Sequence, residues 1–320
     1  MNSEVCKSRR RALELLSAGV GVAALTGPLG ALSNPALAQA TVEGSDFPKV
    51  IGTMGRYRTR ANDTLVDIAR MHRLGFVEVK AANPGVDVWL PGEGTEILLP
   101  EQRLVPDAPA RGIVINLCEM CLYYFPKGGT RPMTFPLGVG REGRGTPMGN
   151  TSIVRKTEHP TWYPPASIRA EKPELPSVVP PGPENPLGTR ALYLGWPAYL
   201  IHGTSMPLGV GRRVSAGCIR MYNEDVETLY PQVPVGTPVT VVDQEVKIAW
   251  LDDGELYVEV SPSQEQADQI EISGYFEPVM PEGMIDLVLE KAGAQAGRLD
   301  WAAIERAGRQ RLGYPIRITV

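Results

Sequence analysis

A histidine and a cysteine stand sixteen positions apart in the stretch YLIHGTSMPLGVGRRVSAGCIRM. His202 ends an apolar run, and Cys218 directly follows Gly217. A cysteine reacts as its thiolate, and a nearby imidazole supplies either the proton acceptor or the positive charge that lowers the thiol pKa. The glycine permits a tight turn that exposes the sulfur and points backbone N–H groups toward an incoming carbonyl oxygen. These residues predict acyl transfer through a cysteine.

Simpler interpretations of the same residue types stay open at this point. A single cysteine is more often buried than catalytic, and a single histidine is more often a satisfied polar group. The three histidines lie far apart without a paired-cysteine frame, so we expect no metal site and no cofactor. Gly138, Gly140 and Gly143 form G-x-G-x-x-G, but a β-branched run rather than a helix follows, which excludes a dinucleotide site.

Two further cysteines, Cys118 and Cys121, lie three positions apart across an expected turn in NLCEMCLYYF. Their α-carbons can come close enough for a disulfide. A redox C-x-x-C is disfavoured, because the flanks predict a hairpin rather than a strand leading into a helix. If these two pair, Cys218 is the unpaired thiol among the cysteines that follow residue 40.

Residues 1–40 have the features of an export signal: a basic head, a weakly apolar middle and an A-x-A ending. Arg9 and Arg10, followed by Leu13, resemble the twin-arginine export pattern. Pro28 and several glycines interrupt the apolar run, which favours cleavage over an uncleaved anchor helix. We therefore expect a periplasmic protein without a stable membrane span after cleavage.

The length of 320 residues is enough for roughly two compact domains. Residues 1–40 hold four of the 32 basic and two of the 36 acidic residues, so the remaining chain has a net charge of minus six. This charge argues against nucleic acid as a partner.

A small module opens the part that follows. Asp63 can cap a helix that carries Leu65, Ile68 and Ala69 on one face, a second short helix follows, and an aliphatic run ends the module as a strand. The segment NDTLVDIA…AANPGVDVWLPGEGTEILLP resembles a LysM module, which implies binding of N-acetylglucosamine-containing glycan such as peptidoglycan. The alternative is a module that packs against its neighbour and holds no glycan.

Residues 111–243 contain short β-type runs between glycine- and proline-rich connections, which predicts a mostly antiparallel sheet or barrel. One helix is expected at 224–230, capped by Asn223. Residues 160–187 contain nine prolines, so we expect an irregular loop that shapes access to a site. The tail predicts a β-hairpin around Asp-Asp-Gly and two helices, near 283–292 and 300–311.

The motif HGT…SAGCIRM, with GREGRGTPMGNTSIVRKTEHPTWYPPASI upstream, resembles the catalytic domain of the L,D-transpeptidases, of the YkuD type. The chain most resembles the ErfK/YbiS group of Gram-negative periplasmic enzymes, which pair this domain with LysM. The resemblance implies a mostly β fold: a YkuD-like β-sandwich or barrel, preceded by a small α/β (βααβ) LysM-like module and followed by a mixed α/β tail. The expected division is an export signal (1–40), an N-terminal linker (41–56), the LysM-like module (57–100), a linker (101–110), the catalytic domain (111–243) and a C-terminal subdomain of unknown role (244–320).

The resemblance also implies roles for single residues. Cys218 matches the nucleophile and His202 the base, while Ser215 and Gly217 shape the turn and the oxyanion hole. Arg220 is expected to support the site or a substrate carboxylate. Further substrate-binding candidates are Gly203, Thr204 and the aromatic residues Trp162, Tyr163, Trp196 and Tyr199, although aromatics among short strands are often core. Ala216 stands where the family usually has a histidine.

The implied reaction is an attack of the cysteine on the L-centre carbonyl of diaminopimelate in a tetrapeptide stem, with release of D-alanine. A second amine then takes the acyl group, giving a 3-3 cross-link or, with a lysine of an outer-membrane lipoprotein, a wall-anchored protein; carbapenems are expected to mimic the donor. Peptidoglycan stem peptides and glycan are the expected partners. The alternatives are a hydrolase of the same fold, acting as an L,D-carboxypeptidase or detaching wall proteins, and a catalytically silent peptidoglycan-binding protein.

Overall fold

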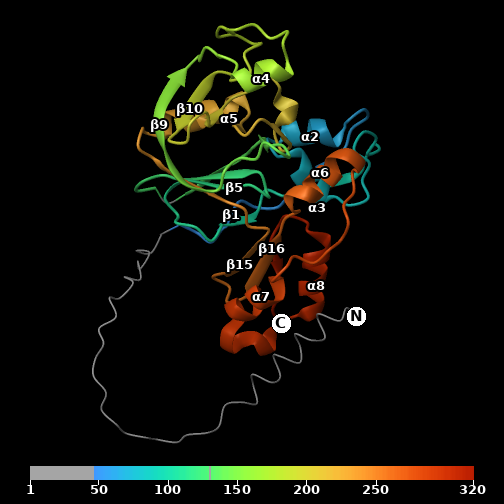
Figure 1. Ribbon diagram of the computed structural model, residues 1–320. Helices are drawn as coiled ribbons and strands as arrows, with labels where there is room; N and C mark the ends of the chain where they lie inside the picture. Colours follow the sequence, from blue (N-terminus) through green and yellow to red (C-terminus); the bar gives the residue numbers. More distant parts are fainter. Residues whose placement is uncertain (1–46, 130) are drawn as a thin grey trace, which may run out of the picture.

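The computed structural model describes residues 47–129 and 131–320. The expected export signal and the first part of the expected N-terminal linker lie outside these residues. The described chain forms a small α/β module, a mostly β central domain and a mixed α/β tail, as expected (Figure 1). None of its helices has the length and apolar character needed to cross a membrane.

One eight-stranded sheet forms the central domain, in the order β13-β11-β10-β9-β14-β5-β6-β7. The pairs β11–β13 and β14–β5 are parallel and the other neighbours are antiparallel, so the expectation of a mostly antiparallel sheet is confirmed. Its strands are β5 (Gly112–Asn116), β6 (Cys121–Phe125), β7 (Met133–Pro136), β9 (Gly149–Glu158), β10 (Arg190–Leu194), β11 (Leu200–His202), β13 (Ile219–Arg220) and β14 (Pro238–Val242). A separate parallel pair joins β8 (Val139–Gly140) to β12 (Arg213–Ser215).

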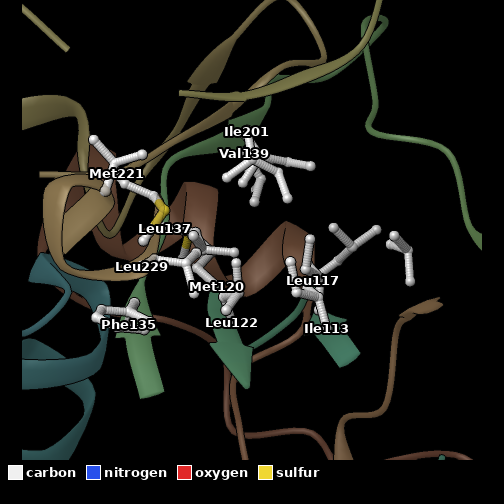
Figure 2. Packing of buried hydrophobic residues seen from close by; sticks show 14 of the residues in the cluster. Ile113, Leu117, Met120, Leu122, Phe135, Leu137, Val139, Ile201, Met221 and Leu229 are labelled. Atoms are coloured by element: carbon white, nitrogen blue, oxygen red, sulfur yellow. The ribbon is translucent and has the colours of Figure 1, made fainter. Parts of the chain in front are cut away.

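Alternate residues of these strands point into one large buried cluster. Ile113, Leu122 and Ile201, from β5, β6 and β11, are fully buried there and converge in Figure 2. Successive side chains of a strand point to opposite faces, so burying Ile201 directs its neighbours Leu200 and His202 to the other face of β11. This alternation fixes which side of the sheet carries the catalytic candidates.

Two helices of the central domain differ from expectation in detail. The proline-rich segment contains a short helix, α4 (Ala166–Glu171), where we expected no regular structure; it fits between two prolines, and Pro165 is its N-cap. The expected helix after the catalytic motif is α5 (Asn223–Leu229), but its N-cap is Tyr222 and Asn223 is its first residue. Short 3-10 helices cover Pro207–Gly209, Tyr230–Gln232 and Gly293–Arg298.

Strand β6 is buried on both faces, which gives the expected linkers a structural role. Tyr123 and Phe125 point away from the main cluster. The backbone pair β1 (Val50–Ile51) with β4 (Arg103–Leu104) lies on this side, and Phe47 packs edge-on against Phe125 with ring centroids 5.2 Å apart. The described parts of the expected linkers, 47–56 and 101–110, thus pack against β6, because a mostly apolar strand needs cover on both faces.

The module has the expected order of strand, helix, helix and strand. The helix face predicted from Leu65, Ile68 and Ala69 is fully buried. The N-cap of this helix is Thr64 rather than Asp63, because the Thr64 hydroxyl accepts the Asp67 N–H at 3.1 Å. The elements of the module are β2 (Gly55–Arg58), α2 (Leu65–Met71), α3 (Phe76–Ala82) and β3 (Glu96–Leu99).

The tail has a core of its own. Its hairpin and two helices occur where the sequence predicts them, whereas the first helix, α6, was not predicted. Its elements are β15 (Val246–Trp250), β16 (Leu256–Val260), α6 (Gln264–Ser273), α7 (Met284–Ala292), α8 (Trp301–Gln310) and β17 (Ile316–Arg317). In Figure 1, β15, β16, α7 and α8 lie together at the end of the molecule opposite the α4 loop.

A buried ion cluster, here called the Lys247 joint, ties the tail to the central domain; it consists of Lys247, Glu119, Glu259 and Tyr123. The Lys247 ammonium lies 2.8 Å from Glu119, 2.7 Å from Glu259 and 2.9 Å from the Tyr123 hydroxyl. Burial disfavours its charge, but the two carboxylates outweigh burial and raise the pKa of Lys247. All members are at least nine-tenths buried, so the charges of the joint are paired with one another rather than with water.

Cys118 and Cys121, the possible disulfide pair, are free and buried. The Cys118 thiol donates to the Gln244 carbonyl at 2.9 Å, and the Cys121 thiol to the Leu122 carbonyl at 3.7 Å. Burial raises the pKa of both, that of Cys121 to about 12. The assignment of Cys218 therefore has to rest on its own surroundings, since it is not the only free thiol of the described residues.

Candidate active site

Strands β11 and β13 bring His202 and Cys218 to the same face of the sheet. The strands are parallel neighbours, with Ile201 opposite Ile219 and His202 opposite Arg220. Both isoleucines are fully buried in the core. Because side chains alternate along a strand, His202 and Arg220 lie on the opposite face, and Cys218, just before β13, follows the same alternation. Two residues sixteen positions apart in sequence thus lie at neighbouring strands of the sheet.

Ser215 closes the turn that leads to Cys218. Its hydroxyl accepts the Gly217 N–H at 3.1 Å and donates to the Cys218 carbonyl at 2.5 Å. The expected turn-shaping role of Ser215 agrees with these bonds. The Gly217 N–H, which is also a predicted oxyanion-hole donor, is engaged with Ser215 in this state. The Cys218 N–H forms no hydrogen bond within the described residues and remains as a donor.

Gly217 is required at this turn for two reasons. Its φ is +107°, a conformation that residues with a side chain rarely adopt. A Cβ at this position would also lie 2.8 Å from the Tyr199 ring. On the other side, the Thr146 hydroxyl donates to the Gly217 carbonyl at 2.8 Å and accepts the Gly140 N–H at 3.2 Å.

His202 is held with one nitrogen free for chemistry. Its Nδ1 lies 2.6 Å from the Gly203 carbonyl, which can only accept, so the proton is on Nδ1 and Nε2 carries the lone pair. The Cys218 thiol donates to the Ala198 carbonyl at 3.4 Å, and no hydrogen bond joins it to His202 within residues 47–129 and 131–320. Such contacts often tighten only when substrate is bound.

The pKa values describe a neutral pair. Burial lowers the pKa of His202 to about 4, opposed by the Gly203 carbonyl and assisted by Arg220. Burial raises the pKa of Cys218, opposed by a backbone hydrogen bond from Leu200 and by the charge of Arg220. Near neutral pH the pair is therefore a thiol and an uncharged imidazole, so His202 supplies no fixed positive charge to the thiol.

Comparison with known proteins agrees with this geometry. Residues 110–241 match the model of the YkuD family, described as an L,D-transpeptidase catalytic domain. The probable L,D-transpeptidase YbiS of Escherichia coli K12 is 40% identical over 256 residues, which cover 78% of this chain and 81% of YbiS. The probable L,D-transpeptidase ErfK/SrfK of the same organism is 43% identical over 201 residues, covering 61% of this chain and 64% of the relative.

The chain belongs to the L,D-transpeptidase family. Members are cysteine-dependent transpeptidases that act on peptidoglycan, which agrees with a cysteine and a histidine meeting on one sheet face. In this L,D-transpeptidase the usual histidine before the glycine is replaced by Ala216, which is exposed at the turn. The replacement leaves His202 as the histidine of the site.

The aromatic candidates divide into two pairs. Tyr199 abuts Gly217 and so borders the turn, and Trp196 packs edge-on against Tyr199 with ring centroids 6.3 Å apart. Trp162 and Tyr163 lie in the proline-rich segment, where Trp162 pairs through its backbone with Val179. No ring contact or hydrogen bond links either one to Cys218 or His202 in the described part of the chain.

Asn223 is a positioning residue that the sequence did not reveal. Its side-chain oxygen accepts the N–H groups of Thr189 and Thr204, at 3.3 and 3.1 Å, and its amide donates to the Thr204 carbonyl at 2.9 Å. A Cβ on Gly203 would lie 2.2 Å from that oxygen. The asparagine thus holds the Gly203–Thr204 backbone whose carbonyl orients His202. Thr204 therefore has a structural role in the site. The sequence singles out Asn223 only as a helix cap, not as a residue that holds this backbone.

Proposed function

We propose that this L,D-transpeptidase transfers an acyl group from a peptidoglycan stem peptide through a thioester on Cys218. The observation that carries the proposal is that Cys218 and an uncharged, buried His202, whose Nε2 is free to take a proton, lie on one face of the sheet at neighbouring strands. The family and the two relatives support the same class of reaction.

In the first step His202 Nε2 takes the thiol proton, and the sulfur attacks the L-centre carbonyl of diaminopimelate. The carbonyl oxygen becomes negatively charged, and the unpaired Cys218 N–H is placed to stabilise it. The carbon–nitrogen bond to D-alanine then breaks, and the leaving nitrogen receives the proton from His202. The product is a thioester and free D-alanine.

In the second step an amine attacks the thioester, gives its proton to His202, and releases the Cys218 thiol. A diaminopimelate amine yields a 3-3 cross-link, and a lysine of an outer-membrane lipoprotein yields a wall-anchored protein. Both acceptors are uncharged nucleophiles when they react, so the same neutral imidazole serves both steps. We place this reaction in the periplasm of a Gram-negative bacterium, reached through the signal at residues 1–40.

We also propose that the module of residues 57–100 holds wall glycan. Two large apolar side chains support this: Trp89 and Leu90, between α3 and β3, are 65% and 82% exposed. Stacking of sugar rings on such a surface would retain the enzyme on its polymeric substrate. Trp89→Ala should weaken co-sedimentation with purified peptidoglycan while leaving activity on a soluble tetrapeptide unchanged; equal sedimentation of both proteins would exclude this role.

The central experiment is acylation by a carbapenem, followed by intact mass spectrometry of residues 41–320 and of the Cys218→Ala variant. One adduct on the wild type alone is expected. Cys118→Ala, which removes a buried thiol, is the matched control and should be acylated like the wild type. No adduct on the reduced wild-type protein would favour the silent wall-binding alternative. D-Alanine release that is independent of an added amine would favour the hydrolase.

A further inference from the structure

Residues 138–146 run beside the nucleophile turn and bring two arginines to it. Gly138 and Arg220 exchange two backbone hydrogen bonds of 2.8 Å, and the Arg141 N–H donates to the Ser215 carbonyl at 3.0 Å. The backbone carbonyl of Arg144 faces Gly217, 3.5 Å from where a Cβ would stand. The backbone of Arg141 is therefore hydrogen-bonded to the turn, and the backbone of Arg144 lies against it.

Positive charge is in excess at this place. Glu171 of α4 forms ion pairs with both Arg141, at 3.0 Å, and Arg144. Arg220 forms no ion pair within the described residues, and it interacts electrostatically with both Cys218 and Arg141. Two of the three guanidinium groups, those of Arg141 and Arg144, thus share one carboxylate, and the third, that of Arg220, pairs with none in the described part of the chain. Glu142, in the same loop, also forms no ion pair there, and its charge acts on Asp268 instead.

Glu171 is weakly held. Helix α4 has no fully buried residue, and besides the Glu171 ion pairs its Ser167 hydroxyl accepts a long hydrogen bond of 3.5 Å from Arg144. Glu171 and Arg141 are 39% and 43% exposed, and ion pairs this exposed to water contribute little to stability. The base of the proline-rich loop, in contrast, is fixed by the Trp162–Val179 backbone pair and by the Asn185 amide, which donates to the Pro160 carbonyl at 2.8 Å. The loop can therefore release α4 while its base stays in place.

We propose that Arg141 and Arg144 form a binding site for a carboxylate of the donor stem peptide, and that Glu171 occupies this site until the peptide displaces it. The inference rests on the proposed function. The D-alanine carboxylate of a tetrapeptide lies one residue from the carbonyl that Cys218 attacks, and the second carboxylate of diaminopimelate is on the residue attacked. Two guanidinium groups bind one carboxylate with paired, charge-assisted hydrogen bonds. Exchanging one carboxylate for another preserves this pairing and moves α4 off the site.

The test measures KM and kcat for D-alanine release from a soluble tetrapeptide. Glu171→Gln should lower KM by about threefold to tenfold, because the competing charge is gone while the side chain keeps its shape. Arg141→Gln with Arg144→Gln should raise KM by about tenfold to a hundredfold. The matched control is Glu96→Gln, which breaks the exposed Arg56–Glu96 pair of the module and should change neither constant. Alkylation of Cys218 by iodoacetamide, which has no carboxylate, should be equally fast in all four proteins.

Two amidated peptides identify the carboxylate: one is blocked at the D-alanine terminus and the other at the diaminopimelate carboxylate. The peptide that lacks the bound group should have a raised KM with the wild type and no further increase with the double arginine variant. A raised KM or lowered kcat in Glu171→Gln would make Glu171 a support of the active loop and overturn the inference. So would equal KM values for all peptides and variants, while D-alanine release by the wild type would still support the proposed function. If the wild type neither releases D-alanine nor reacts with a carbapenem, both the proposed function and the inferred carboxylate site are overturned.

Discussion

The Lys247 joint and the Cys218 site both bury ionisable groups, but the joint holds charged groups in contact with one another, whereas the site keeps its histidine and cysteine uncharged. In the joint, both buried carboxylates, Glu119 and Glu259, contact the Lys247 ammonium, and burial raises the pKa of Glu259 to about 7. In the site, burial keeps His202 and Cys218 uncharged, and Arg220 has no ion-pair partner in the described residues. A complete set of partners stabilises one arrangement of the chain, whereas an incomplete set leaves interactions for a substrate to form.

The largest expected effect comes from breaking the joint. Lys247→Met leaves Glu119 and Glu259 facing each other without a cation, and removal of one partner of a buried pair typically costs about 3–5 kcal/mol. We expect a loss of this size in the free energy of unfolding, measured by urea denaturation. Cys218 alkylation in the folded fraction should be unchanged, because the joint lies outside the site.

The control for this prediction removes the carboxylates as well. Lys247→Met combined with Glu119→Gln and Glu259→Gln leaves no unpaired charge and should recover part of the lost stability. A loss below about 1 kcal/mol for Lys247→Met alone would show that the joint is not the element that fixes the tail to the central domain.

A smaller effect is expected at Asn223, and it should appear in catalysis. Asn223→Ala removes three hydrogen bonds from the Thr189 and Gly203–Thr204 backbone, so the carbonyl that orients His202 becomes less fixed. We expect kcat/KM to fall by about tenfold to a hundredfold, in line with other groups that position a catalytic side chain. Nitrogen NMR shifts of His202 should show a mixture of tautomers.

The matched control is Asn150→Ala. Asn150 accepts a hydrogen bond from Thr240 at 3.0 Å on an exposed part of β9, away from the turn. It should leave kcat/KM and the His202 tautomer unchanged. If Asn223→Ala retains a single tautomer and full activity, the Gly203 backbone is held by the sheet alone.

The sequence predicts the site better than it predicts the joint, for a physical reason. Cys218 and His202 belong to a local motif whose glycines and strands are readable from neighbouring residues. The joint depends on Glu119, Lys247 and Glu259, which come from different parts of the chain, and a buried lysine has no signature in sequence. For the same reason the sequence does not predict that Arg103, in an expected linker, is buried in an ion pair with Glu78.

Within the site, the sequence also predicts residue types better than their state. The motif predicts that Gly217 and Ser215 form the turn, but it does not show that the Gly217 N–H donates to the Ser215 hydroxyl. The sequence pattern places Asn223 at the start of a helix, where asparagine is common. The hydrogen bonds of Asn223 to the backbone of Thr189 and Thr204 depend on tertiary contacts instead. The cysteine spacing suggested a disulfide, although the two thiols have separate buried partners.

The smallest expected change is in pH dependence, where the unpaired charge of Arg220 should act on both members of the catalytic pair. His202 must be neutral to accept a proton, so kcat/KM should stay level as pH falls from neutrality and decline only through about 4. Arg220 lowers the pKa of both His202 and Cys218. Arg220→Met should therefore move the acid limb to higher pH, because His202 protonates earlier, and should also raise the pH at which Cys218 alkylation accelerates.

Arg220→Lys, which keeps the charge, is the control for this last comparison and should leave both limbs near their wild-type positions. Cys218→Ala supplies the background for alkylation, since Cys118 and Cys121 are buried with raised pKa values. If Arg220→Met shifts neither limb, burial alone sets the neutral state of the pair, and the excess positive charge at the site serves substrate binding only. If it shifts both upward, one arginine without an ion-pair partner both tunes the catalytic pair and contributes to the charge that an anionic peptide meets.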